Sequence, residues 1–294
     1  MSSRRIIENA LGQPLQSHWH HPEGEPTGLV VIAPAIGITQ SYYQALAAWL
    51  AKQGLLAVTF DYHGVGESLR GPLRQVRSNV LDWARHDCGA VLEIVRETGP
   101  QLPLYWIGHS LGGQIVPFIP GNQRIDKLIT VACGCGYWKD NAKDTYGKAL
   151  LLWYGLVPVL TPLFGHFPGK RLNIIGDLPR NVVWQWRQWC LTPRYAAGVS
   201  AEHQALYSAF SRPISGLAFL DDELISPTNI RTLHASFDQA PVQVKFIDPA
   251  AEGLPKVGHL GFFRRQFEAS LWPRLLEEMD LAVEEPERLS VSRG

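Results

Sequence analysis

The five-residue segment GHSLG at positions 108–112 constrains this chain most, because it joins a strand-like run to a helix-compatible run through one sharp turn. Residues 104–108 suit a buried strand, and the residues after Gly112 suit a helix. In a G-x-S-x-G turn, side chains at the first and last positions would collide with neighbouring atoms, so both are glycine. The segment therefore predicts a serine raised above the edge of a sheet, with the following backbone N–H at a helix N-terminus.

Strand-like and helical patterns alternate along the rest of the chain. Continuous apolar strands separated by helices predict a mostly parallel sheet that is covered on both faces. A hairpin precedes these elements. We expect the hairpin at 4–9 and 15–20, strands at 29–33, 55–61, 104–108, 129–132, 214–220 and 242–247, and helices at 42–53, at 79–98 and from about residue 262.

Two further strand ends carry the side chains that an attacking serine needs. The strand at 214–220 runs into Asp221 and Asp222, and the loop after the strand at 242–247 reaches His259. A histidine can take the proton of Ser110, and a carboxylate can orient that histidine and stabilise its charged form. Serine, acid and histidine thus follow one another in the order that a G-x-S-x-G turn favours.

The sequence resembles the α/β-hydrolase superfamily over nearly its whole length. Besides the turn and the two strand ends, residues 60–68, FDYHGVGES, resemble the D-x-R-G-x-G-x-S loop of many members, with His63 in place of the arginine. Segments 186–195 and 258–264 are similar to a poorly characterised bacterial subgroup of predicted serine hydrolases. The resemblance implies an α/β-hydrolase fold, with a mostly parallel central sheet flanked by helices and an inserted helical cap. Residues 1–136 and 211–294 would form the core, and residues 137–210 the cap.

The resemblance also implies roles for individual residues. Two backbone N–H groups would stabilise the oxyanion, one from Leu111 and one from the loop after the strand at 29–33. We favour Ile36 for the second, with Ala35 or Gly37 as alternatives. Among the two acids we favour Asp222, because the superfamily often has a branched apolar residue three positions later, and Ile225 stands there. Asp221 is the alternative, and otherwise caps a turn or faces solvent.

Aromatic residues are concentrated in the predicted cap. Five of the ten tryptophans lie there: Trp138, Trp153, Trp184, Trp186 and Trp189. Large aromatic surfaces over a serine site favour an apolar substrate, so Trp138, Trp153 and Trp186 are candidates for substrate binding, although they could instead form the cap's own core. His63 is a further candidate, with a structural hydrogen bond as the alternative.

Composition limits the partners and the location. Lys plus Arg and Asp plus Glu both total 27, and no basic block suggests nucleic-acid binding. The N-terminus lacks the apolar run of a secretion signal, and four cysteines form no disulfide framework, so we expect a cytoplasmic protein. Residues 149–169 are uncharged but contain three prolines, so we expect no continuous spanning helix. Contact between the cap and lipid is a less favoured alternative.

These observations predict a serine hydrolase that cleaves a carboxylic ester of an apolar small or medium substrate through an acyl-enzyme intermediate. Thioesterase or amidase and peptidase activity with the same three residues are alternatives, as is a non-catalytic binding protein with an idle triad. No cofactor or metal site is indicated, and the oligomeric state is left open.

Overall fold

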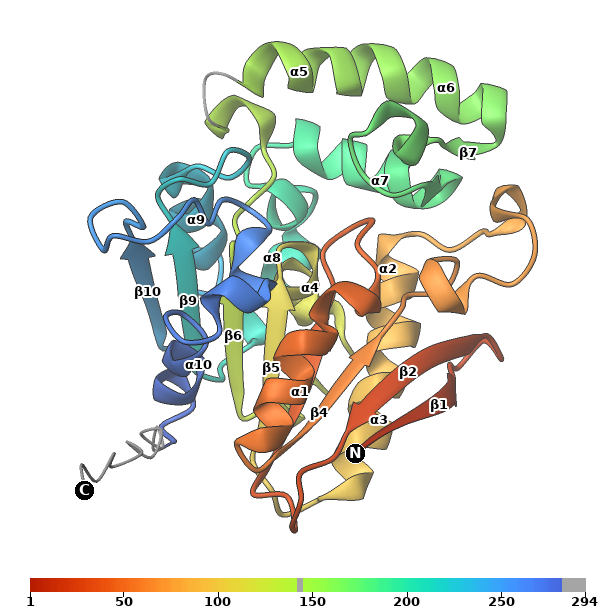
Figure 1. The fold of residues 1–294 in the computed structure, drawn as a ribbon. Coiled ribbons are helices and arrows are strands. Elements are labelled where there is room, and N and C mark those ends of the chain that lie inside the picture. The colour runs from red at the N-terminus through yellow and green to blue at the C-terminus, as the bar shows by residue number, and fades with distance from the viewer. Residues whose placement is uncertain (142–144, 282–294) are drawn as a thin grey trace, which may run out of the picture.

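The computed structural model describes residues 1–141 and 145–281, and its centre is an eight-stranded sheet (Figure 1). The strands lie in the order β1-β2-β4-β3-β5-β6-β9-β10. Strands β1 and β2 form an antiparallel hairpin, β2 pairs antiparallel with β4, and the other neighbours are parallel. The predicted α/β architecture is confirmed. The strand bounds are β1 Ser2–Glu8, β2 Pro14–His20, β3 Gly28–Ala33, β4 Leu55–Phe60, β5 Leu104–His109, β6 Lys127–Val131, β9 Ile214–Phe219 and β10 Val242–Ile247.

Helices cover both faces of the sheet, because successive strand side chains point to opposite faces. In β3, Val31 belongs to a core cluster that α3 and α8 complete, whereas Val30 and Ile32 belong to a second cluster that α1 and α10 complete. Helix α9 carries Ile230 into a third, smaller cluster. The helix bounds are α1 Gln44–Lys52, α2 Val80–Asp82, α3 Gly89–Thr98, α4 Leu111–Gln114, α8 Ala201–Ala209, α9 Pro227–His234 and α10 Pro273–Glu278.

Two predicted helices differ in detail from the structure. The helix expected at 79–98 forms, with an Asn79 capping box at its start, but its middle is the π-helical segment η4, Trp83–Cys88. The helix expected from about residue 262 is wrong in its start. That stretch forms two short 3₁₀ turns, η12 Gly261–Phe263 and η13 Arg265–Phe267, and the α-helix begins only at Pro273, which suits a first helical turn.

Much of the chain between β6 and β9 forms a layer above the carboxyl ends of the parallel strands (Figure 1). This layer holds α5 Tyr146–Leu150, the π-helical η9 Leu151–Leu156, α6 Val157–Phe164, the short pair β7 His166–Phe167 and β8 Leu178–Pro179, and α7 Arg180–Leu191. Helix α8 lies on the core and not in this layer. Its Tyr207 hydroxyl donates to the Gln114 carbonyl, and the Gln123 side chain of the core donates to the Ala209 carbonyl of α8. The cap boundaries at 137 and 210 stay a prediction.

The expectation that prolines interrupt the uncharged segment is wrong. Residues Tyr146–Phe164 run without a break through α5, η9 and α6, and Pro162 lies inside α6. Pro158 directly follows the π-helical segment and is the second residue of α6. By length and composition alone this helix could cross a membrane.

Candidate active site

Ser110 occupies the sharp turn between β5 and α4. Its backbone has φ 48° and ψ −113°, a conformation that a non-glycine residue adopts only under strain. The flanking glycines allow the turn, since a Cβ on Gly108 would lie 2.4 Å from the Gly113 nitrogen and one on Gly112 would lie 2.2 Å from the Ala33 carbonyl oxygen. The turn therefore requires glycine at both positions.

The strained serine backbone is held by its neighbours. Its N–H donates to the carbonyl of Val131 at 3.1 Å, and its own carbonyl accepts from Gly113 and Gln114. The Cys133 thiol also donates to that carbonyl, at 3.1 Å. These bonds fix the backbone that carries the raised side chain.

His259 and Asp222 form a buried pair. Nδ1 of His259 donates to Oδ2 of Asp222 at 2.8 Å, and their side chains are 7% and 1% exposed. The other oxygen, Oδ1, accepts the backbone N–H groups of Leu224 and Ile225. The carboxylate is thus bonded on both oxygens, which fixes the imidazole with its Nε2 free to accept a proton.

Asp221 has a different position from its neighbour. Its two oxygens accept the N–H groups of Val257 and Gly258, at 2.8 and 3.0 Å. The structure therefore pairs His259 with Asp222, while Asp221 anchors the backbone of the loop that carries His259.

The two predicted oxyanion donors lie in the expected segments. The N–H of Leu111 is at the start of α4, directly after Ser110. In the loop after β3, the N–H of Ala35 donates to the Tyr43 hydroxyl at 3.0 Å, which removes Ala35 as a donor. The Ala35 carbonyl accepts from Ile38, so the Ile36 N–H in the same peptide unit points the opposite way.

The serine and histidine come from adjacent loops. The ring of His109, the residue before Ser110, lies 5.4 Å from the ring of His259. Between the described residues, no hydrogen bond joins the Ser110 hydroxyl to His259. Such bonds are often loose in unliganded sites and tighten when substrate binds.

The substrate-binding candidates fall into two groups. His63 is hydrogen-bonded to residues of the core. Its Nδ1 bonds the Ser78 hydroxyl, and its backbone N–H donates to the Asp87 carboxylate. Trp153 and Trp186 pack edge to face at 4.8 Å within the cap, and Trp153 is 4% exposed. Trp138, in η7 Trp138–Asp140, is half-buried and contacts the Tyr146 ring.

Sequence reasoning missed two tyrosines beside the site. The Tyr43 hydroxyl bonds Nδ1 of His109 at 2.7 Å, and the Tyr42 hydroxyl donates to the carbonyl of Leu260, next to His259. Both lie where η1, Gln40–Tyr43, meets α1. Their only sequence signal was a pair of aromatic residues in a predicted helix.

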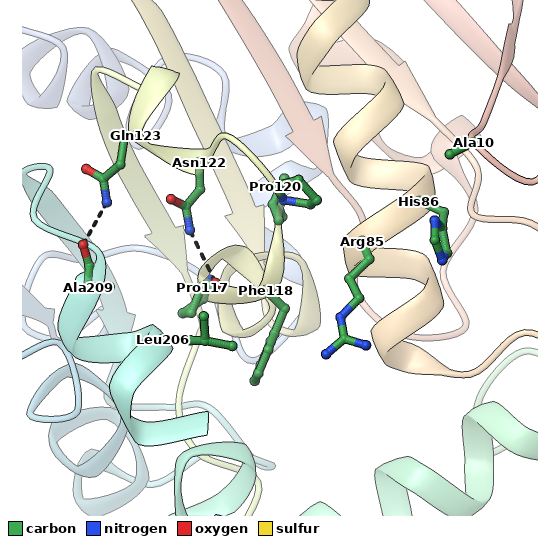
Figure 2. Close-up of a pocket in the computed structure, with 11 residues that line it drawn as sticks. Ala10, Arg85, His86, Pro117, Phe118, Pro120, Asn122, Gln123, Leu206 and Ala209 are labelled. Atoms are coloured by element: carbon green, nitrogen blue, oxygen red, sulfur yellow. Dashed lines mark hydrogen bonds between the residues drawn. The ribbon is translucent and has the colours of Figure 1, made fainter. Parts of the chain in front are cut away.

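A cleft of about 710 Å³ opens on another side of the core (Figure 2). Its wall holds Phe118, Leu206 and Arg85. Its amides are already used, since Asn122 donates to the Pro117 carbonyl and Gln123 to the Ala209 carbonyl. None of the candidate catalytic residues lines this cleft.

The sheet order, the strained serine turn and the acid–histidine pair define the class of α/β-hydrolase proteins. The family described as serine aminopeptidase, S33, matches residues 24–173, about half of the chain. This chain belongs to that family.

Curated relatives resemble the chain over a shorter stretch. The monoglyceride lipases of Rattus norvegicus and Homo sapiens are 29% and 30% identical to it over 111 residues, which are 37% of this chain. The match spans about a third (35%) of the length of each lipase.

Solved structures extend the likeness of the fold to the whole chain. A carboxyl esterase from Bacillus coagulans has a TM-score of 0.65 at 14% identity, covering 95% of this chain and 98% of the esterase. A Pyrococcus furiosus esterase has a TM-score of 0.64 at 13% identity, covering 95% and 91%. At these identities the likeness concerns the fold alone.

Proposed function

We propose that this protein is a serine hydrolase that cleaves carboxylic esters of apolar small or medium substrates through an acyl-enzyme intermediate. One observation carries the proposal: the strained, glycine-flanked Ser110 directly follows His109, whose ring bonds the His259 carbonyl, and His259 is paired with the buried Asp222. Strain of this kind persists where the surrounding structure enforces it, and it is common at catalytic residues.

The first half of the reaction forms the acyl-enzyme. Nε2 of His259 takes the proton of the Ser110 hydroxyl while the oxygen attacks the ester carbonyl carbon. Asp222 holds the imidazole tautomer and stabilises the imidazolium. The carbonyl oxygen becomes an oxyanion, which the N–H groups of Leu111 and Ile36 stabilise. His259 then gives its proton to the leaving alkoxide, and an alcohol departs.

The second half repeats these steps with water. His259 takes a proton from water, and the resulting hydroxide attacks the acyl carbon. Collapse of the second oxyanion breaks the bond to Ser110, which regains its proton from His259 as the carboxylic acid leaves. Each half uses the same three side chains and the same two N–H groups.

Ester cleavage is favoured over the alternatives by the names of the similar proteins. The curated relatives are monoglyceride lipases, and the two solved structures are esterases, whereas the family description names an aminopeptidase. Thioester and amide cleavage remain the second candidates, and monoacylglycerols are the first glycerol esters to assay.

Covalent labelling tests the proposal and separates it from an idle triad. We expect an alkyl fluorophosphonate to add once to the wild-type protein, and Ser110→Ala to abolish the mass shift. p-Nitrophenyl esters and thioesters of graded chain length, with an anilide for amide cleavage, would then rank the substrate classes. A wild-type protein that neither reacts with the phosphonate nor hydrolyses any ester would contradict the proposal.

We further propose a cytoplasmic location. All four cysteines, Cys88, Cys133, Cys135 and Cys190, are free and buried, which supports a reducing compartment.

A further inference from the structure

A continuous chain of hydrogen bonds crosses the core beneath the candidate site. It begins at the N–H of Ala35, passes through the hydroxyl of Tyr43 and the imidazole of His109, and ends at the carbonyl of His259. The three bonds measure 3.0, 2.7 and 3.0 Å. The side chains of Tyr43 and His109 are fully buried, so water does not compete for these bonds.

Chemistry fixes the direction of every proton in this chain. A carbonyl oxygen only accepts, so Nε2 of His109 carries the hydrogen that is donated to His259. Nδ1 of His109 is then the acceptor, and the Tyr43 hydroxyl must donate to it. The same hydroxyl oxygen accepts the N–H of Ala35. One imidazole tautomer and one hydroxyl orientation satisfy all the groups.

These hydrogen bonds keep their directions because His109 stays neutral. Burial, and secondarily the nearby imidazole of His259, lower the pKa of His109 well below its usual range. A protonated His109 would lose its acceptor at Nδ1 and break the bond from Tyr43. The neutral form therefore persists through the pH range in which the active histidine must itself be unprotonated.

We propose that Tyr43 and His109 are positioning residues of this hydrolase. They hold two loops at a fixed separation across the serine turn: the base loop, which carries His259, and the oxyanion loop, which follows β3 and carries Ile36. The inference rests on the proposed function. His109 is itself part of the turn, so its two ring nitrogens connect the residue before Ser110 to both other loops. At one end these hydrogen bonds hold the backbone of His259, and at the other they hold the peptide unit directly before the one that carries the Ile36 N–H.

A tyrosine at the far end of β5 gives a matched control. The Tyr105 hydroxyl donates to the carbonyl of Met279 at 3.0 Å, and Tyr105 is 7% exposed. Tyr43→Phe and Tyr105→Phe each remove one buried hydroxyl, but Tyr43→Phe breaks two hydrogen bonds and Tyr105→Phe one, so we expect both to lower the melting temperature and Tyr43→Phe to lower it more. Only Tyr43→Phe should slow hydrolysis, with kcat falling about tenfold or more and KM nearly unchanged.

Substitutions of His109 sharpen the test. His109→Gln keeps an amide N–H near the position of Nε2, whereas His109→Leu removes both hydrogen bonds. We expect His109→Gln to retain more kcat than His109→Leu at equal foldedness. Equal losses of kcat in Tyr43→Phe and Tyr105→Phe, with an active wild type, would overturn the positioning role and leave the proposed function standing.

An independent measurement does not depend on turnover. Histidine ¹⁵N chemical shifts of the Ser110→Ala protein should show His109 protonated on Nε2, accepting at Nδ1 and neutral at pH 6. In Tyr43→Phe the His109 Nδ1 signal should move toward that of a free acceptor. A His109 ring that carries its proton on Nδ1 would overturn the inference. An unreactive wild-type protein would contradict the proposed function itself, and the hydrogen bonds from Ala35 to His259 would then have no catalytic role.

Discussion

The catalytic loops and the cap are held in different ways. The loops that carry Ser110, Asp222 and His259 are tied by short hydrogen bonds among buried groups. The cap meets this region through close backbone contact, and its long helix exposes apolar side chains to solvent. Fixed bonds suit groups that must keep sub-ångström geometry, whereas a looser layer can differ between substrates without disturbing the chemistry.

The largest effect that would test this difference concerns the two adjacent acids. Asp222→Asn removes the carboxylate that fixes the tautomer of His259, and we expect kcat to fall about 10⁴-fold. Asp221→Asn keeps one acceptor for the Val257 and Gly258 N–H groups, so we expect a loss of about tenfold or less. Steady-state kinetics on one ester checks both. Equal, mild losses would show that the Asp222–His259 bond has no catalytic role.

The same contrast explains how far the sequence could predict this molecule. The strands and the turn at Ser110 follow from local spacing of apolar residues and glycines, and the predicted strand ends fall close to the observed ones. The pairing of His259 with Asp222 also matches the favoured reading. The contact between Tyr43 and His109 joins residues 66 positions apart and depends on how η1 packs against the end of β5, which no local pattern encodes.

The cap was harder to predict for a related reason. Proline usually interrupts helices, yet the chain from Tyr146 to Phe164 stays helical through both Pro158 and Pro162, with a π-helical segment directly before Pro158. The tryptophans show the same limit. Their number indicated an aromatic cap, but only the structure shows that Trp153 and Trp186 contact each other.

The next largest effect concerns the outer face of the cap helix. Leu151, Val159 and Leu163 are 59%, 63% and 72% exposed along it. Residues 137–210 hold eight Lys and Arg against four Asp and Glu, in a chain of zero net charge. An exposed apolar face on a basic layer suits an anionic lipid surface. Lipid contact by the cap, the less favoured alternative from the sequence, predicts that the protein floats with anionic vesicles and that serine at all three positions weakens binding about 100-fold.

A matched triple substitution on the core controls for general hydrophobicity. It changes to serine three exposed residues on the β1–β2 hairpin and α3: Ile6, Leu11 and Ile94. These changes should leave flotation intact, because the residues lie away from the cap helix. If the wild-type protein does not float with the vesicles at low salt, the cap does not bind lipid.

A smaller effect is expected where the cap touches the oxyanion loop. Gly176 of the cap lies against Gly37, and a Cβ on Gly176 would come within 2.3 Å of the Gly37 carbonyl oxygen. Gly176→Ala must therefore move the cap away from the loop that holds Ile36. We expect kcat/KM to fall about tenfold on small esters, with a smaller loss on bulky ones, because the oxyanion donor shifts while the site opens.

Gly147→Ala is the control within the same cap. Apart from its chain neighbours and the backbone of its own helix, no atom of the described residues lies within 4 Å of the position that its Cβ would take, and Gly147 is part of α5. Alanine is a better helix former than glycine, so this variant should be at least as stable as wild type and equally active. The same kinetics in both variants would show that the contact between Gly176 and Gly37 does not set the geometry of the site.

The smallest effect concerns pH and the buried imidazoles of the core. Burial lowers the pKa of His234, whose Nδ1 donates to the Ile230 carbonyl and whose Nε2 accepts from the Thr130 hydroxyl. The folded protein therefore binds a proton there less readily than the unfolded chain, whose histidines titrate near 6.5. Stability from this group is fully present above about pH 6.5 and is lost as pH falls toward the lowered pKa. Burial also lowers the pKa of His109, so its contribution to stability is likewise lost as pH falls.

Burial raises the pKa of Asp87 to about 7, which contributes with the opposite sign, so the histidine effect is measured as the difference between wild type and His234→Gln in denaturant unfolding between pH 7.5 and 5. His234→Gln replaces the imidazole with a side chain that does not titrate, so it should lower stability at pH 7.5 but reduce the slope below pH 6.5. The pH dependence that remains in His234→Gln includes the contribution of His109. Protonation of His109 would break the hydrogen bond from Tyr43, so the stability of the core depends on a neutral His109. Parallel slopes in wild type and His234→Gln would mean that this imidazole takes up its proton in the folded protein as readily as in the unfolded chain.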